Sequence, residues 1–95
     1  MPKGYVIARA MVTDPEKWAD YAGGASAAMK TYGGTPIVRG GRCEVAEGEG
    51  RARNVVIEFE SFEAARAYAH SEEYAAARAK RIGAGVIDIV VVEGA

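Results

Sequence analysis

The 95-residue sequence predicts an α+β fold: a four-stranded antiparallel sheet with helices on one face. Three observations lead to this fold class. Apolar, β-branched stretches alternate with stretches of helical periodicity in the order β-α-β-β-α-β. The length suits one domain and is too short for two, and neither a linker nor an internal repeat divides the chain. We therefore expect residues 1–95 to form a single domain.

The N-terminal third predicts a strand followed by a long helix. Residues 4–12 are mostly apolar and β-branched, as in a strand. Asp14 can cap the free N–H groups of a helix, and Pro15 suits its first position. The glycine pair 33–34 ends this helix. The pair 23–24 lies inside it, where each glycine costs about 1 kcal/mol relative to alanine, so a break or kink is expected there.

The middle of the chain predicts two strands. The first covers about residues 35–46, with a bulge or bend at the glycine pair 40–41. Residues 47–50 are polar and rich in glycine, which indicates a hairpin connection. Residues 54–60 form the next strand.

The C-terminal third predicts a helix in two parts and a last strand. Ser61 caps the first part, which breaks near His70. Ser71, followed by two acidic residues, caps the second part, and Gly83 stops it. Residues 86–93 form the fourth strand. The resulting βαββαβ order is that of the ferredoxin-like fold.

Both faces of the predicted sheet carry apolar residues. The wholly apolar sets are assigned to the helix-facing core, because an unpaired charge is costly in a dry interior. They comprise Val6, Ala8, Ala10, Val12, Val55, Ile57, Phe59, Ile87, Ile89 and Val91. The opposite face mixes charges with aliphatic residues and is too apolar to be left in water. It predicts a homodimer in which this face is covered by the same face of a second subunit.

Three charged residues, Arg9, Glu58 and Asp88, share that second face. They either pair with one another, which would serve strand register, or line a polar pocket. Arg39 or Arg42 joins them, and the glycine pair between the two arginines leaves the strand parity open. These five residues are candidate ligand-binding residues.

His70 leads the candidates for acid–base catalysis, because histidine is the residue type that titrates near neutral pH. The alternative is a helix-end residue that hydrogen-bonds free carbonyl groups. We expect His70, Tyr74 and an arginine of the second strand to line a cleft near one end of the sheet. Trp18 and Tyr21 lie at helical spacing and are assigned to the core rather than to stacking on a ligand.

Charge and composition argue against several classes of function. The net charge is −1 and no segment concentrates Lys or Arg, so nucleic acid is not an expected partner. A single Cys43 and a single histidine give neither a disulfide nor a zinc cluster. The glycine pairs lack the spacing of a phosphate-binding loop, and no bound cofactor is expected. The first residues resemble neither a signal peptide nor a membrane span, which predicts a cytoplasmic protein without a membrane partner.

Seven short fragments follow one another along the chain: Lys3-Gly4-Tyr5, Val12-Thr13-Asp14-Pro15-Glu16, Tyr32-Gly33-Gly34, Arg39-Gly40-Gly41, Glu47-Gly48, Glu58-Phe59 and His70-Ser71-Glu72-Glu73-Tyr74. In that order and at those spacings they resemble domain-of-unknown-function family 1330, a branch of the dimeric α/β-barrel superfamily. One departure is Glu72, where the family commonly has proline after His-Ser. The resemblance implies a homodimer whose two sheets close into a barrel with the helices outside.

The resemblance does not imply a single reaction, because the superfamily includes small monooxygenases, haem-degrading enzymes and muconolactone isomerase-like proteins. Three classes of function follow. One is a cofactor-independent enzyme on a small aromatic or carbonyl-containing metabolite, with an arginine holding an anion and His70 or a carboxylate moving a proton. The others are a non-catalytic small-molecule binder and a dimeric interaction or structural module. An enclosed pocket would favour the first two classes.

Overall fold

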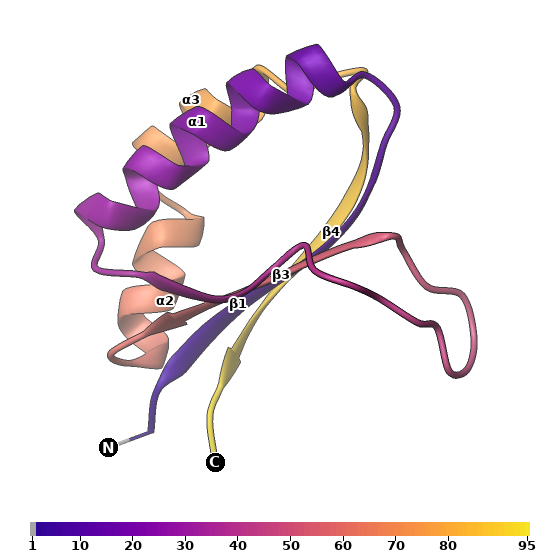
Figure 1. Ribbon diagram of the computed structural model, residues 1–95. Coiled ribbons are helices and arrows are strands. Elements are labelled where there is room, and N and C mark those ends of the chain that lie inside the picture. The colour runs from indigo at the N-terminus through magenta and orange to yellow at the C-terminus, as the bar shows by residue number, and fades with distance from the viewer. Residues whose placement is uncertain (1) are drawn as a thin grey trace.

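The computed structural model describes residues 2–95 and has a curved sheet with all its helices on one face (Figure 1). The elements in chain order are β1 (Gly4–Val12), α1 (Pro15–Thr31), β2 (Thr35–Arg39), β3 (Arg53–Phe59), α2 (Phe62–Ala69), α3 (Glu72–Ala79) and β4 (Gly85–Glu93). The strands lie in the order β2-β3-β1-β4, and every neighbouring pair is antiparallel. The predicted ferredoxin-like fold is confirmed, including the division of the second helical segment.

The three predicted helix caps are present. The Asp14 carboxylate accepts a hydrogen bond from the backbone N–H of Lys17 at 3.2 Å, at the start of α1. The Ser61 hydroxyl accepts one from Ala64 at 3.1 Å, and Ser71 caps α3 in the same way. Each cap satisfies an N–H group that the first helical turn leaves without a partner. The sequence therefore determines where all three helices begin.

The second strand is shorter than predicted, because β2 ends at Arg39 instead of continuing to residue 46. Gly40 has φ +68° and turns the chain away from the sheet after its N–H bonds the Asn54 carbonyl at 2.8 Å. Residues 41–49 are exposed, and Figure 1 shows residues 40–52 projecting from the sheet. We call residues 40–52 the arm. The turn predicted at residues 47–50 lies within it, with Gly48 at φ +75°.

The strand irregularity also lies elsewhere than predicted. The pairing of β2 with β3 shifts register between Pro36 and Val38, not at the glycine pair 40–41. Pro36 has no N–H to donate to the ladder, and β2 is an edge strand, where such a residue is tolerated. Proline, rather than the glycine pair, therefore explains the irregularity.

The predicted division of the sheet faces is confirmed except at Val12, which the alternation assigns to the core but which is 36% exposed at the last position of β1. Val6, Ala10, Ile57 and Phe59 are buried under the helices. The remaining helix-facing residues of β3 and β4 are partly buried and pack against them: Val55, Ile87, Ile89 and Val91. The opposite face, which we call the open face, comprises Ile7, Met11, Val38, Val56, Val86, Val90 and Val92 with the charged residues between them.

Helix α1 passes through Gly23 and Gly24 without the expected break. A Cβ atom on Gly24 would lie 2.9 Å from the Cβ of Ala77 in α3, which is closer than real Cβ contacts. Gly24 therefore lets α1 and α3 approach closely. Gly23 faces open space, because a Cβ atom added there would have no neighbouring atom within 4 Å.

These neighbouring glycines make a matched pair of substitutions. Gly23→Ala should raise the free energy of unfolding by about 0.5–1 kcal/mol, since it adds helix propensity without a clash. Gly24→Ala should be about 1–3 kcal/mol less stable than Gly23→Ala, because the added methyl group must displace Ala77. Urea unfolding followed by circular dichroism measures both, and equal stability of the two variants would contradict the close approach.

Candidate functional site

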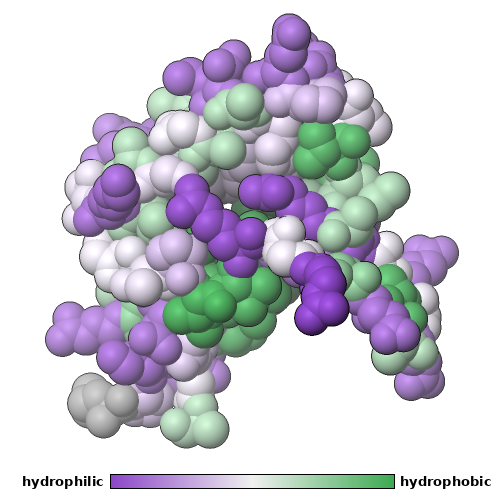
Figure 2. All heavy atoms as spheres, in the orientation of Figure 1, coloured by the Kyte–Doolittle hydropathy of each residue, from purple (hydrophilic) through white to green (hydrophobic). Residues whose placement is uncertain are grey.

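A cavity of about 570 Å³ lies between the helices and the helix-facing side of the sheet. It exists because α1 packs chiefly against α3, whereas α2 packs against strands β1, β3 and β4. Helix α1 thus arches over the sheet without closing on it (Figure 1). Figure 2 shows the hollow between the helical layer and the sheet, with hydrophilic side chains around it and hydrophobic ones beneath.

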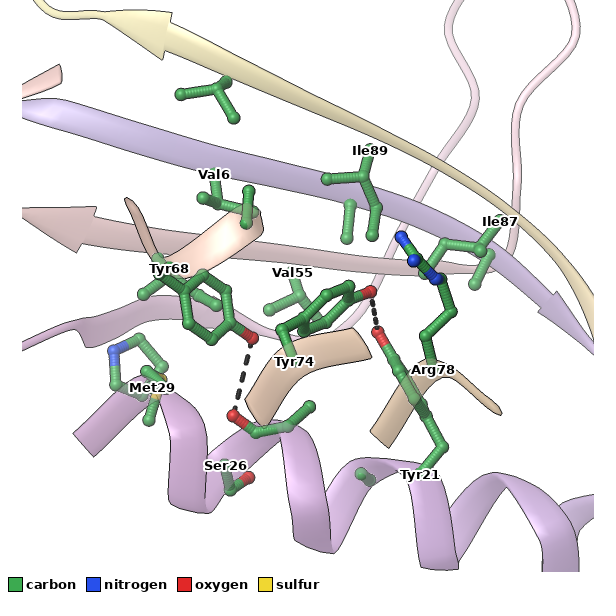
Figure 3. A pocket seen from close by; sticks show the side chains of 18 of the residues that line it. Val6, Tyr21, Ser26, Met29, Val55, Tyr68, Tyr74, Arg78, Ile87 and Ile89 are labelled. Atoms are coloured by element: carbon green, nitrogen blue, oxygen red, sulfur yellow. Dashed lines mark hydrogen bonds between the residues drawn. The ribbon is translucent and has the colours of Figure 1, made fainter. Parts of the chain in front are cut away.

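The inner wall of the cavity is mostly apolar. Trp18 and Tyr21, assigned to the core from their spacing, are each only 7 % exposed, and both also line the cavity. The strands contribute Val6, Ala8, Ala10, Val55, Ile57, Ile87, Ile89 and Val91, and Figure 3 shows several of these facing the helices. The wall suits a flat, largely apolar ligand.

Three tyrosines place hydroxyl groups beside this apolar wall (Figure 3). The hydroxyls of Tyr21 and Tyr74 share a hydrogen bond of 2.7 Å, and the Tyr68 hydroxyl donates to the Ala25 carbonyl at 3.4 Å. Burial, followed by the neighbouring Tyr74, raises the pKa of both Tyr21 and Tyr68 above the ordinary value of 10.0. These two hydroxyls therefore stay protonated and act as hydrogen-bonding groups, not as bases.

The turn between α2 and α3 positions two of these tyrosines. The buried Ser71 hydroxyl donates to the Tyr68 carbonyl at 2.8 Å and accepts from the Tyr74 N–H at 3.0 Å. His70 is the C-cap of α2, and its own N–H bonds the Arg66 carbonyl at 3.0 Å. One serine side chain therefore fixes the turn that carries His70 to the cavity.

Five arginines and one histidine also line the cavity: Arg39, Arg53, Arg66, Arg78, Arg81 and His70. The Arg78 side chain extends from α3 towards Ile87 and Ile89 (Figure 3). The Arg81 guanidinium carbon lies 5.1 Å from the centre of the Tyr21 ring. A cationic rim thus surrounds an apolar interior.

The structure brings three of the sequence-derived candidates together. His70, Tyr74 and Arg39 all line the cavity, from the α2–α3 turn, α3 and β2 respectively. Arg42 is exposed on the arm and does not line it. Arg39 pairs with Val55 and faces the helices, so the prediction that it could join Arg9, Glu58 and Asp88 on the second face is wrong. The register shift between Pro36 and Val38 sets this direction.

The other three candidates lie on the open face, with the sheet between them and the cavity. Arg9 and Asp88 are register partners in β1 and β4, and Glu58 lies on β3. The Glu58 carboxylate accepts a hydrogen bond from the Tyr5 hydroxyl at 3.3 Å. Within residues 2–95, these three charges neither line the cavity nor form an ion pair with one another.

Two of these charges contact the arm instead. Arg9 donates to the Glu49 carbonyl at 3.2 Å, and Asp88 forms an ion pair with Arg51 at 2.9 Å. The Asp88 side chain is 67 % exposed, so this pair contributes little to stability. Both contacts hold the base of the arm to the open face.

The sequence reasoning missed Arg53, Arg66, Arg78 and Arg81. Arginine side chains in helices, at strand ends and in turns are usually solvated, so residue type alone did not single out these four. One usable signal was the spacing of Tyr74, Arg78 and Arg81, because positions i, i+4 and i+7 share one helix face. If Tyr74 faces the space under the helices, arginines four and seven residues later face that space too.

Among residues 2–95, no three His, Cys, Asp or Glu side chains gather where they could hold a metal ion. In the same part of the chain, no helix is both long and apolar enough to cross a membrane.

The buried tyrosine pair predicts sensitivity to alkali. The raised pKa of Tyr21 means that the folded state holds this proton more tightly than the unfolded chain does. The associated stability is complete below the ordinary tyrosine value near pH 10 and is lost as the pH rises above it. We expect the free energy of unfolding to fall above about pH 10, less steeply in Tyr21→Phe than in the parent. Urea titrations from about pH 8 to about pH 11.5 measure this, and equal slopes would contradict it.

The sequence matches a known family profile, and the fold matches several solved structures. The profile of the family described as "Domain of unknown function (DUF1330)" matches residues 3–95. A protein of unknown function from Rhodopseudomonas palustris is 15% identical, with a TM-score of 0.73 over 96% of this chain and 81% of that one. A protein from Caulobacter crescentus CB15, proposed to be an antibiotic biosynthesis monooxygenase, is 19% identical, with a TM-score of 0.61 over 99% and 91%.

A dimeric ferredoxin-like protein of unknown function from Thermobifida fusca is 17% identical, with a TM-score of 0.53 over 99% of this chain and 91% of that one. No functionally curated protein matches the sequence. At these identities the solved structures establish the ferredoxin-like fold alone. The profile match covers nearly the whole chain, and the protein therefore belongs to the DUF1330 family.

Proposed function

We propose that this protein binds a small, flat and largely apolar metabolite in the cavity between the helices and the sheet, and that it does so as a homodimer. The cavity of about 570 Å³ carries this proposal. Its volume and its mostly apolar wall are those of a small-ligand site. A pure interaction module needs no such space, because packing contacts stabilise a filled interior better than an empty one.

His70 is our candidate for proton transfer to or from a bound carbonyl-containing ligand. It lines the same cavity as the tyrosine hydroxyls, and no Asp or Glu is among the described residues that line it. The sequence offered two acid–base groups, histidine or carboxylate, and the absence of a carboxylate from the described lining supports the histidine for this role. Arg39 and Tyr74 would then help to orient the ligand.

The homodimer would form through the open face. Several of its aliphatic residues are substantially exposed, among them Met11 at 46%, Val86 at 53% and Val90 at 51%. A domain of this size buries only about two thirds of its unfolded surface, so covering a further apolar face would stabilise it. A protein of the same fold from Thermobifida fusca is described as dimeric, which supports a dimer here.

Filling the cavity tests the ligand proposal. Val55→Phe places a larger side chain in the cavity, while Val45→Phe places the same side chain on the exposed arm, outside the cavity. A thermal-shift panel of aromatic acids, lactones and quinones first identifies a ligand that stabilises the parent. We expect Val55→Phe to weaken its binding about tenfold or more, and Val45→Phe to leave binding within about twofold.

Fluorescence adds a check on location, because Trp18 is the sole tryptophan of the chain and lines the cavity. A ligand in the cavity should change the Trp18 emission. If no member of the panel shifts the melting temperature, or if Val55→Phe binds as tightly as the parent, the proposal is wrong. Binding unchanged in His70→Ala would remove His70 from the site.

The dimer is tested at Ile7, which lies between Val56 and Val90 in the middle of the open face. We expect light scattering after size-exclusion chromatography to give the parent the mass of two chains, against 10.0 kDa for one. Ile7→Arg should shift the protein towards the monomer, because it buries an unpaired charge in the interface. Ala19→Arg, at an exposed position of α1, should remain dimeric. A parent that is monomeric at micromolar concentration would refute the dimer.

A further inference from the structure

The charged residues that line the cavity are all basic. Five of the eight arginines in the chain line it, although the net charge of the whole protein is −1. No aspartate or glutamate is among the described residues that line it. Within residues 2–95, the ion pair between Arg51 and Asp88 lies outside the cavity, and no cavity arginine has a carboxylate oxygen within 4.0 Å. The cavity therefore concentrates positive charge without an internal counter-charge.

Arginine cannot relieve this concentration by losing a proton, because its guanidinium stays charged at every physiological pH. An apolar wall behind the charges strengthens their field, since it excludes the water that would screen them. Arg39, Arg66 and Arg78 are exposed, so water also screens them, whereas Arg53 and Arg81 are partly buried. A bound anion would balance the charge of the partly buried arginines. The shape of the cavity indicates a flat apolar ligand, and the charge pattern adds that this ligand is an anion.

Resting on the function proposed above, we propose that the ligand is an aromatic or similarly flat apolar carboxylate, held with its carboxylate against Arg81 and Arg78 and its apolar body against the strands. Both arginines and the Tyr21–Tyr74 pair line the cavity and come from the facing helices α1 and α3 and the turn after α3. The strand residues Val55, Ile87 and Ile89 line its opposite wall.

Arg81 is the best-placed anion ligand of the five. Its guanidinium carbon lies 5.1 Å from the centre of the Tyr21 ring, a cation–π contact that uses the flat face of the group. Its Nε is buried and has no hydrogen-bond partner among the described residues. Because the buried Nε is out of reach of water and of a ligand alike, the terminal N–H groups are those that a carboxylate could meet, and stacking through the flat face leaves them pointing away from the ring. A planar carboxylate matches these groups with two parallel hydrogen bonds.

The tyrosine pair supplies a further donor beside Arg81. In the 2.7 Å contact between the Tyr21 and Tyr74 hydroxyls, one proton lies in the shared hydrogen bond. The other hydroxyl proton remains available to an oxygen atom of the ligand. Burial raises the pKa of Tyr21, so its hydroxyl stays neutral and does not repel an anion. The carboxylate would thus meet guanidinium and hydroxyl donors together.

Matched ligands separate this inference from the binding function on which it rests. Isothermal titration calorimetry with 2-naphthoate and with 2-naphthamide compares a carboxylate with a neutral group on the same ring system. We expect naphthoate to bind the parent at least about tenfold more tightly, the effect of a charge-assisted hydrogen bond. Arg81→Gln should remove that preference and leave naphthamide affinity within about twofold. Arg42→Gln loses the same charge on the exposed arm and should bind both ligands as the parent does.

The outcomes are distinct. If neither ligand binds and the wider panel also fails, the proposed function falls. If both bind equally, or if Arg81→Gln keeps the preference, the cavity remains a ligand site but the carboxylate assignment is wrong. Tighter binding of 2-naphthyl phosphate than of naphthoate would overturn it in favour of a phosphate ester. Should Arg81→Gln fail to fold, Arg78→Gln replaces it, together with the salt dependence of naphthoate binding to the parent. A preference for naphthoate that does not change with salt would count against the inference.

Discussion

The contact between α1 and α3 is the constraint on which the rest of the structure depends. Gly24 allows the close approach to Ala77, and the hydroxyls of Tyr21 and Tyr74 join the two helices by a 2.7 Å hydrogen bond. Because α1 is fixed to α3, it does not settle onto the sheet. The space left between α1 and the sheet is the cavity. The Tyr21 and Tyr74 residues whose hydroxyls join the two helices also line it.

The sequence was informative wherever a local rule sufficed. Asp14, Ser61 and Ser71 marked the three helix starts because capping depends on neighbouring backbone groups only. Strand alternation likewise identified the helix-facing residues, because side-chain direction has a period of two. The second strand was overestimated because its end depends on Gly40 adopting a positive φ, which residues 42–46 do not reveal. The break expected at the glycine pair 23–24 did not occur, because packing against α3 outweighed helix propensity.

The candidate site was harder to predict, because periodicity states which side of an element faces inward and not whether the interior is filled. Trp18 and Tyr21 fit a core helix face, and they are buried, yet they border a cavity. Arg9, Glu58 and Asp88 drew attention as charges among apolar strand residues, but they lie on the open face. Arg78 and Arg81 lie at helical spacing from Tyr74, which was the available signal, but the stacking of Arg81 on Tyr21 depends on the tertiary structure.

The alternation along each strand also bears on how such a protein can diverge. Val55 and Val56 are adjacent in sequence, yet one borders the cavity and the other belongs to the open face. Point substitutions can therefore alter the chemistry of the interior at one set of positions while those between them retain the outer surface. Under the proposed function, relatives could differ in ligand while keeping the same outer surface, so a similar outer surface would carry no information about a shared ligand.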